Sequence, residues 1–129
     1  MSDELVTWLR TQLDEVEVMA RAAAAFTAGD RWIADGDEVF GATDEGAGVA
    51  TAATWSHAAH IACHDPARVL AEVEAKRRIV DEHAGYDPKT WRTGDAAYDC
   101  TYSTWPCFTM RWLALPYADR PGYREEWRP

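Results

Sequence analysis

The sequence lacks the features that place a protein in a membrane or send it across one. It contains no run of about 18 or more apolar residues, so no segment is expected to cross a bilayer as a helix. The opening residues, MSDELVTWLR, have neither the basic start nor the continuous apolar stretch of a secretory signal peptide. We therefore expect a cytoplasmic protein that makes no membrane contact.

Positive charge is scarce in the first half of the chain. The 129 residues carry 22 acidic and 13 basic side chains, which gives a formal net charge of −9. Residues 1–55 hold half of the acids but only Arg10, Arg21 and Arg31 as bases. Binding to nucleic-acid phosphates or to anionic lipids needs a basic face, so we expect neither. An acidic first half favours a protein partner with a basic surface.

Cysteine and the glycine motifs of common enzymes are also scarce. Cys63, Cys100 and Cys107 are the three cysteines, and an odd set in a reducing compartment indicates thiols or metal ligands rather than a disulfide framework. The chain has no phosphate-binding P-loop, no dinucleotide GxGxxG and no GxSxG nucleophile elbow. These absences favour a non-enzymatic protein.

The first 55 residues predict a long helix followed by a small sheet. Apolar residues recur in steps of three and four from Leu5 to Phe26, which predicts an amphipathic helix over residues 1–28 that stops at Gly29. Residues 31–55 contain short extended pieces separated by acidic, glycine-containing turns, typical of an antiparallel sheet of two or three strands.

The helical pattern returns after residue 55. A short helix is predicted over Ser56–Cys63, and a longer one follows Asp65-Pro66, with Asp65 as N-cap, up to Ala84. Residues 85–129 predict a loop, a short helix over Cys107–Leu115 and an aromatic, charged tail. We therefore predict one α+β domain over residues 1–129, with a long N-terminal helix, a small antiparallel sheet and a helix-rich C-terminal half.

Seven tryptophans are many for this length, and six of them fall into two predicted groups. Trp8, Trp55, Trp105 and Trp112 are expected to pack in the core. Trp91 and Trp127 lie in the loop and the tail, where they either dock on the domain or form an interface. The apolar neighbours of Cys63 favour a buried thiol over a nucleophile.

Two segments of the chain resemble a known family. The first is HIACHDPARVL at residues 60–70, which continues as AEVEAKRRIVDEH to residue 83. The second is WPC at 105–107, with LALPYAD at 113–119 and REEW at 124–127. Together they resemble DUF6221, small uncharacterised proteins of actinomycete bacteria and their phages. The resemblance implies a phage or mobile-element context but no established activity. Members often carry further cysteines before the WPC segment, where this chain has only Cys100.

Histidines and cysteines form a candidate zinc site. Two thiolates with one or two imidazoles are a usual ligand set for structural Zn²⁺, and a metal would fasten the loop at residues 86–105. The predicted ligands are His83, Cys100 and Cys107, with His64 or His60 as the fourth. In the alternative interpretation, Cys107 is a small core residue and the histidines are surface or capping groups.

The sequence contains no complete set of catalytic residues. It is best interpreted as a small, acidic interaction or accessory protein. Its predicted partner-binding residues are Trp91, Tyr123, Trp127, Asp14, Glu15 and Glu17. A metal-dependent enzyme using the His/Cys cluster is a second hypothesis, although Ile61 stands where an HExxH motif has its general base. A structural phage component is the third. The sequence leaves the oligomeric state open.

Overall fold

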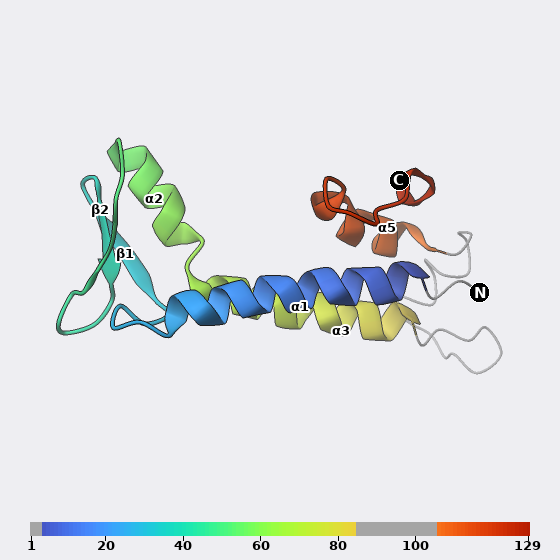
Figure 1. Cartoon of the computed structure of the whole chain (residues 1–129), viewed down its shortest axis with the longest axis horizontal. Coiled ribbons are helices and arrows are strands. Elements are labelled where there is room, and N and C mark those ends of the chain that lie inside the picture. Colours follow the sequence, from blue (N-terminus) through green and yellow to red (C-terminus); the bar gives the residue numbers. More distant parts are fainter. Residues whose placement is uncertain (1–3, 85–105) are drawn as a thin grey trace. The chain divides into compact units, whose positions relative to one another are not determined.

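A computed structural model describes residues 4–84 and 106–129 of the chain (Figure 1). The elements are α1 (Glu4–Ala24), β1 (Trp32–Asp35), β2 (Glu38–Gly41), β3 (Gly48–Thr51), α2 (Trp55–Cys63), α3 (Pro66–Ala84), α5 (Phe108–Ala114), and the 3₁₀ turns η1 (Leu115–Tyr117) and η2 (Glu125–Trp127). The predicted α+β class and its order of elements are confirmed. No helix in these two ranges is long and apolar enough to span a membrane.

The chain folds as two compact units. We call Met1–Asp14 with Ala75–Pro129 the terminal unit, and Glu15–Glu74 the sheet unit. The boundaries fall inside α1 and inside α3, so each of these helices contributes one half to each unit.

The core of the terminal unit begins with leucines repeated every fourth residue of α1. Leu5, Leu9 and Leu13 are at most 1% exposed, because a step of four returns to the same face of a helix. Val80 of α3 and Met110 of α5 are also fully buried. The two helix halves are linked at the surface by ion pairs from Arg10 to Asp81 (2.9 Å) and from Asp14 to Arg77 (2.6 Å).

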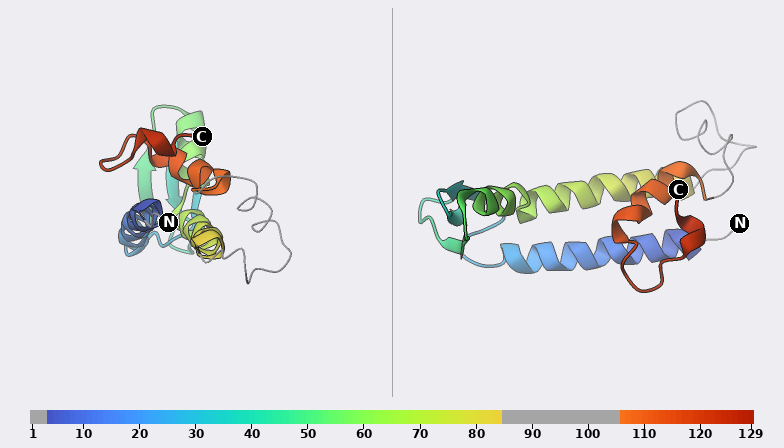
Figure 2. Two further views of the ribbon diagram at one scale, coloured as in Figure 1. Left: turned by 90° about the vertical axis from the view of Figure 1, so that its right-hand side faces the viewer. Right: turned by 90° about the horizontal axis from the view of Figure 1, so that it is seen from above.

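The aromatic tail packs onto the start of α1 (Figure 2). The Trp8 indole N–H donates to the carbonyl of Pro121 at 2.9 Å. The ring of Trp127 lies 5.5 Å from that of Trp8 and 5.8 Å from that of Tyr123, in tilted and edge-on arrangements typical of aromatic pairs. Gly122 has φ +88°, and a Cβ there would lie 2.9 Å from the Trp8 ring nitrogen, so this close approach requires glycine.

In the sheet unit, α1 ends earlier than predicted. It stops at Ala24, so Phe26 falls beyond the helix and is 76% exposed. Ala20 is 7% exposed and lies one turn after the partly exposed Val16. Met19 lies one residue earlier than Ala20, about 100° around the helix, and is 60% exposed. The apolar repeat from Leu5 to Phe26 includes Met19, and its prediction that Met19 and Phe26 lie on the buried face is therefore wrong.

Three strands form an antiparallel sheet in the order β1-β2-β3. β1 and β2 are joined by Gly36 and Asp37, and Gly36 has φ +60°, as expected for glycine at the first position of a type II′ hairpin turn. The pairing of β2 with β3 contains a bulge that leaves Val49 as the extra residue. A Cβ on Gly41 would lie 2.1 Å from the Ala28 carbonyl oxygen, so only glycine fits there.

Asp65 joins the sheet to the start of α3. One carboxylate oxygen accepts from the backbone N–H of Arg68 at 2.9 Å, which confirms the predicted N-cap. The other oxygen accepts from the backbone N–H of Trp32 at 3.0 Å, at the beginning of β1. α2 packs on one face of β1 and β2, and Val39 of β2 and Ala58 of α2 are both buried. Among the described residues, the opposite face of the sheet keeps exposed and partly exposed side chains.

Candidate functional site

Two of the predicted zinc ligands lie side by side in the terminal unit. The Nδ1 atom of His83, near the end of α3, is 3.2 Å from the Sγ atom of Cys107, the residue before α5. Cys107 is fully buried and His83 is 6% exposed. This arrangement is a thiol–imidazole hydrogen bond as it stands, and both atoms are metal-ligating types.

The other predicted ligands are placed differently. His60 and His64 belong to the sheet unit, are exposed, and have ring centres 4.4 Å apart. The Nδ1–H of His64 donates to the His60 carbonyl at 2.9 Å. Cys100 lies outside the described residues. Within residues 4–84 and 106–129, no three His, Cys, Asp or Glu side chains are grouped so as to hold a metal ion.

The predicted partner-binding residues do not form one exposed patch. Asp14 pairs with Arg77, and Glu17 pairs with Arg21 at 2.9 Å, while Glu15 is exposed. Trp127 is 4% exposed and Tyr123 is half-buried, so this part of the tail docks on the terminal unit. Trp91 lies outside the described residues.

Several residues predicted to be buried are instead exposed. Trp55 is 72% exposed at the start of α2, and Trp112 is 59% exposed on α5, where Met110 and Ala114 face the core instead. Trp8 is half-buried, and Trp105 lies outside the described residues. Cys63 is exposed as well, and its sulfur accepts from the Arg68 guanidinium at 3.4 Å.

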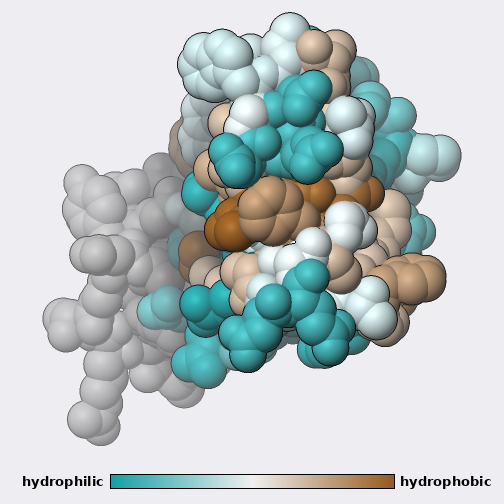
Figure 3. All heavy atoms as spheres, turned by 90° about the vertical axis from the view of Figure 1, so that its left-hand side faces the viewer, coloured by the Kyte–Doolittle hydropathy of each residue, from teal (hydrophilic) through white to brown (hydrophobic). Residues whose placement is uncertain are grey.

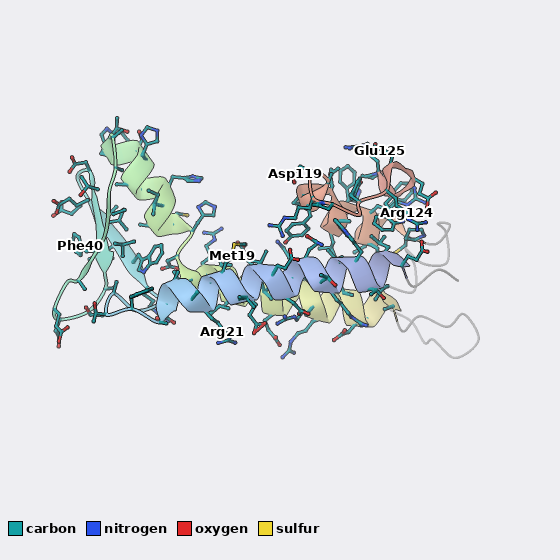
Figure 4. All side chains as sticks on the ribbon, in the orientation of Figure 1. Met19, Arg21, Phe40, Asp119, Arg124 and Glu125 are labelled. Carbon is teal, nitrogen blue, oxygen red and sulfur yellow. The ribbon has the colours of Figure 1, made fainter. Side chains whose placement is uncertain are left out.

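The open face of the sheet carries a band of apolar side chains. Ile33 pairs with Phe40 across β1 and β2, and the bulge places Val49 beside Phe40 on the same side. We call this side of the sheet the outer face. Ile33 is 46% exposed, and Phe40 and Val49 are partly exposed. Figure 3 shows a hydrophobic band across this end of the molecule with hydrophilic residues on both sides, and in Figure 4 Phe40 points away from α2.

Charges lie at the two ends of the outer face. At one end Asp35 stands directly opposite Glu38, a like-charge pair next to Asp37 in the turn. Neither carboxylate makes an ion pair with any described residue. At the other end, Arg31 precedes β1 and is exposed.

A shallow pocket of about 500 Å³ lies beside Arg31. Its lining includes Ile33 and Ala42 from the sheet, and Asp65 and Arg68 from the start of α3. A hydrogen bond to Glu72, with the nearby Cys63 sulfur second in importance, raises the pKa of Arg68. Both oxygens of Asp65 accept backbone N–H groups, and Arg68 is paired with Glu72 at 3.1 Å. Arg31 is exposed at the edge of this pocket.

Sequence reasoning identified the strands but missed the outer face. The available signal was the pair Val39-Phe40, since adjacent strand residues point to opposite faces and both are large and apolar. An apolar residue on each face indicates a strand covered on both sides, or one with an open apolar face. Only the position of α2 shows which face stays open.

Comparison with known proteins identifies the family but no activity. A family of unknown function, DUF6221, matches residues 2–129, so the chain belongs to it. No curated protein and no solved structure matches the chain.

Proposed function

Because membership of a family of unknown function assigns no activity, we propose a function from the outer face. The protein is a small, non-enzymatic interaction protein of the cytoplasm that binds another protein through the outer face of its sheet. The partner presents apolar side chains next to basic ones. The observation that carries the proposal is the exposed Ile33–Phe40–Val49 band, which ends at the opposed carboxylates of Asp35 and Glu38.

Two physical terms favour such a partner. Covering the band removes apolar area from water, at about 25 cal/mol per Å². A cation placed between Asp35 and Glu38 relieves a repulsion that the folded chain otherwise retains, because like charges directly opposite each other destabilise a sheet. The hydrophobic term is insensitive to ordinary salt concentrations and the electrostatic term is screened, so binding should weaken, without vanishing, as salt rises.

The test uses a defined probe, a synthetic strand-forming peptide of alternating valine and lysine, with a valine–glutamate peptide as its counterpart. Binding is followed by NMR shifts of the Ile33, Phe40 and Val49 side chains at low and high salt. We expect shifts with the basic peptide only, reduced by salt and by Phe40→Thr, which keeps a strand-compatible residue. Trp112→Ser is the matched control, since Trp112 is an exposed aromatic residue of the terminal unit.

Equal binding of both peptides, or salt-independent binding, would contradict the proposal. Partners recovered from native cells by wild-type protein but lost with Phe40→Thr then identify the physiological ligand. The family resemblance directs that search to actinomycete hosts and their phages.

We also propose a structural zinc ion in the terminal unit, supported by the His83–Cys107 contact of 3.2 Å. These two residues would supply two of its four ligands, and Cys100 is the sequence's candidate for a third. Metal analysis of untagged protein, with Cys107→Ser and His83→Asn variants, tests it. Stoichiometric zinc lost in both variants supports the site, and metal-free wild-type protein rejects it.

The coordination of a bound metal would separate the remaining roles. Four protein ligands fit a structural ion, whereas an open position would support a metal-dependent enzyme. Copurification with phage particles would instead support a structural phage component.

A further inference from the structure

The outer face has a polarity along the strands. Its cross-strand pairs form three rows in order: Arg31 with Ala42, Ile33 with Phe40, and Asp35 with Glu38. The backbone N–H of Ala42 donates to the Arg31 carbonyl at 2.7 Å, which extends the ladder to the first row. One end of the face is therefore cationic, the middle is apolar and the other end is anionic.

Such an order is complementary to itself. Rows two residues apart along a strand are separated by about 7 Å. A two-fold axis through the central row therefore places the cationic end of one copy against the anionic end of the other, and apolar row against apolar row. Isologous interfaces have this property, because the same patch serves both subunits.

We infer that a second copy of this chain binds to the outer face, with Arg31 of each copy beside Asp35 and Glu38 of the other. The inference rests on the proposed function, since it names one partner for the same face. Two sheets packed in this way form a sandwich, with their faces about 10 Å apart. The two-fold axis forms both contacts at once. In each contact, Arg31 of one copy reduces the repulsion between Asp35 and Glu38 of the other.

The pocket beside Arg31 fits this arrangement. It lies at the cationic end of the face, measures about 500 Å³, and has Arg31 and Arg68 in its lining. The hairpin turn at the opposite end carries Asp37 between the opposed carboxylates, three acids within four residues. The acidic turn of one copy would meet the Arg31 guanidinium there, whereas Arg68 is already paired with Glu72 at 3.1 Å and Asp65 keeps its negative charge.

The face is small, so the association must be weak. The outer strands lie about 10 Å apart, and four residues span about 13 Å along each strand. This footprint is well below the roughly 800 Å² per partner of a stable interface. We expect a reversible dimer that forms at high protein concentration and dissociates on dilution or at high salt.

The test is sedimentation velocity on purified, full-length protein from about 10 µM to 1 mM, at low salt and in 0.5 M NaCl. Two charge-reversal variants are compared: Arg31→Glu, and Asp35→Arg with Glu38→Arg. We expect wild-type protein to approach twice the monomer mass at the highest concentration in low salt. Each variant alone stays monomeric, because its ends repel, and an equimolar mixture associates again.

Circular dichroism and proton NMR of each variant establish that it is folded, and all substituted side chains are exposed. Wild-type protein that stays monomeric over the whole range overturns the inference. A mixture that associates no more than the separate variants overturns the two-fold arrangement. Lost peptide binding in Phe40→Thr beside a strictly monomeric wild type would reject the dimer and leave the proposed function standing.

Discussion

The two units use the same kinds of side chain in opposite ways. In the terminal unit, charges on neighbouring helices pair with each other, as in Arg10–Asp81, and the aromatic tail is buried against Trp8. In the sheet unit, Asp35 and Glu38 have no basic partner among the described residues, and Ile33 and Phe40 face solvent. The comparison is between particular residues: the charges and rings named in the terminal unit contact one another, whereas those on the outer face of the sheet unit remain accessible to another molecule.

The largest expected effect is a loss of stability in the terminal unit. Trp127→Ala removes a ring that is 4% exposed and packed on Trp8 and Tyr123. We expect a loss of about 3 kcal/mol in the free energy of unfolding, measured by urea denaturation. Trp112→Ala, at 59% exposure, should change it by less than about 0.5 kcal/mol. Similar losses in both variants would contradict the docked tail.

A second change acts on the sheet unit alone. Asp65→Ala removes the N-cap of α3 and the acceptor for the Trp32 N–H, and should cost about 2 kcal/mol. Hydrogen exchange should show faster exchange at β1 and the first turn of α3, with the terminal unit unaffected. Asp65→Asn keeps an oxygen acceptor and should lose much less. Equal acceleration in both units would show that they unfold together.

A third change should stabilise the protein. Asp35→Thr removes the repulsion with Glu38 and places a strand-forming residue in β1, for a gain of about 0.5 kcal/mol. Urea midpoints at low and high salt separate the two causes, since only the electrostatic part is screened. If the gain in the free energy of unfolding is smaller in high salt, repulsion between Asp35 and Glu38 is its cause. A surface that binds a cationic partner would keep such a repulsion in the free protein. A loss of stability at low salt would contradict it.

The smallest effect is in the tail. A hydrogen bond from Arg128, together with its charge, lowers the pKa of the Glu125 carboxyl. A lowered folded pKa gives stability that is present above the unfolded pKa and lost as pH falls through the folded value. NMR titration of Glu125 in Arg128→Gln should show its pKa rising toward the ordinary value. No change would mean that the pair does not persist in solution.

Local patterns were sufficient to predict the elements. The glycine of the β1–β2 turn, the Asp65-Pro66 helix start and the leucine repeat of α1 each act within a few residues. Tertiary contacts do not override these local preferences, so the predicted turn and helices are present in the folded chain. The predicted exposure was less accurate: Trp55 and Trp112 are on helices as expected, but their burial depends on what packs against those helices.

The candidate sites show the same division. The sequence named His83 and Cys107 as a pair from their chemical types, and the structure brings them to 3.2 Å. It assigned the partner surface to the acids of α1, where Asp14 and Glu17 are paired with arginines. Arg77 is 63 residues from Asp14, and no local pattern predicts which distant arginine will reach it.

By itself, the sequence determined the α+β class, the order and approximate limits of the helices and strands, the family and the acidic first half. These follow from periodicity, turn residues and composition, which are properties of neighbouring residues. Only the tertiary structure decided which of those acids pair with another described residue and which apolar face of the sheet stays open. The pairing of Asp14 depends on Arg77, which is distant in sequence. The open face depends on α2 covering the other side of the sheet, and no local sequence pattern predicts either contact.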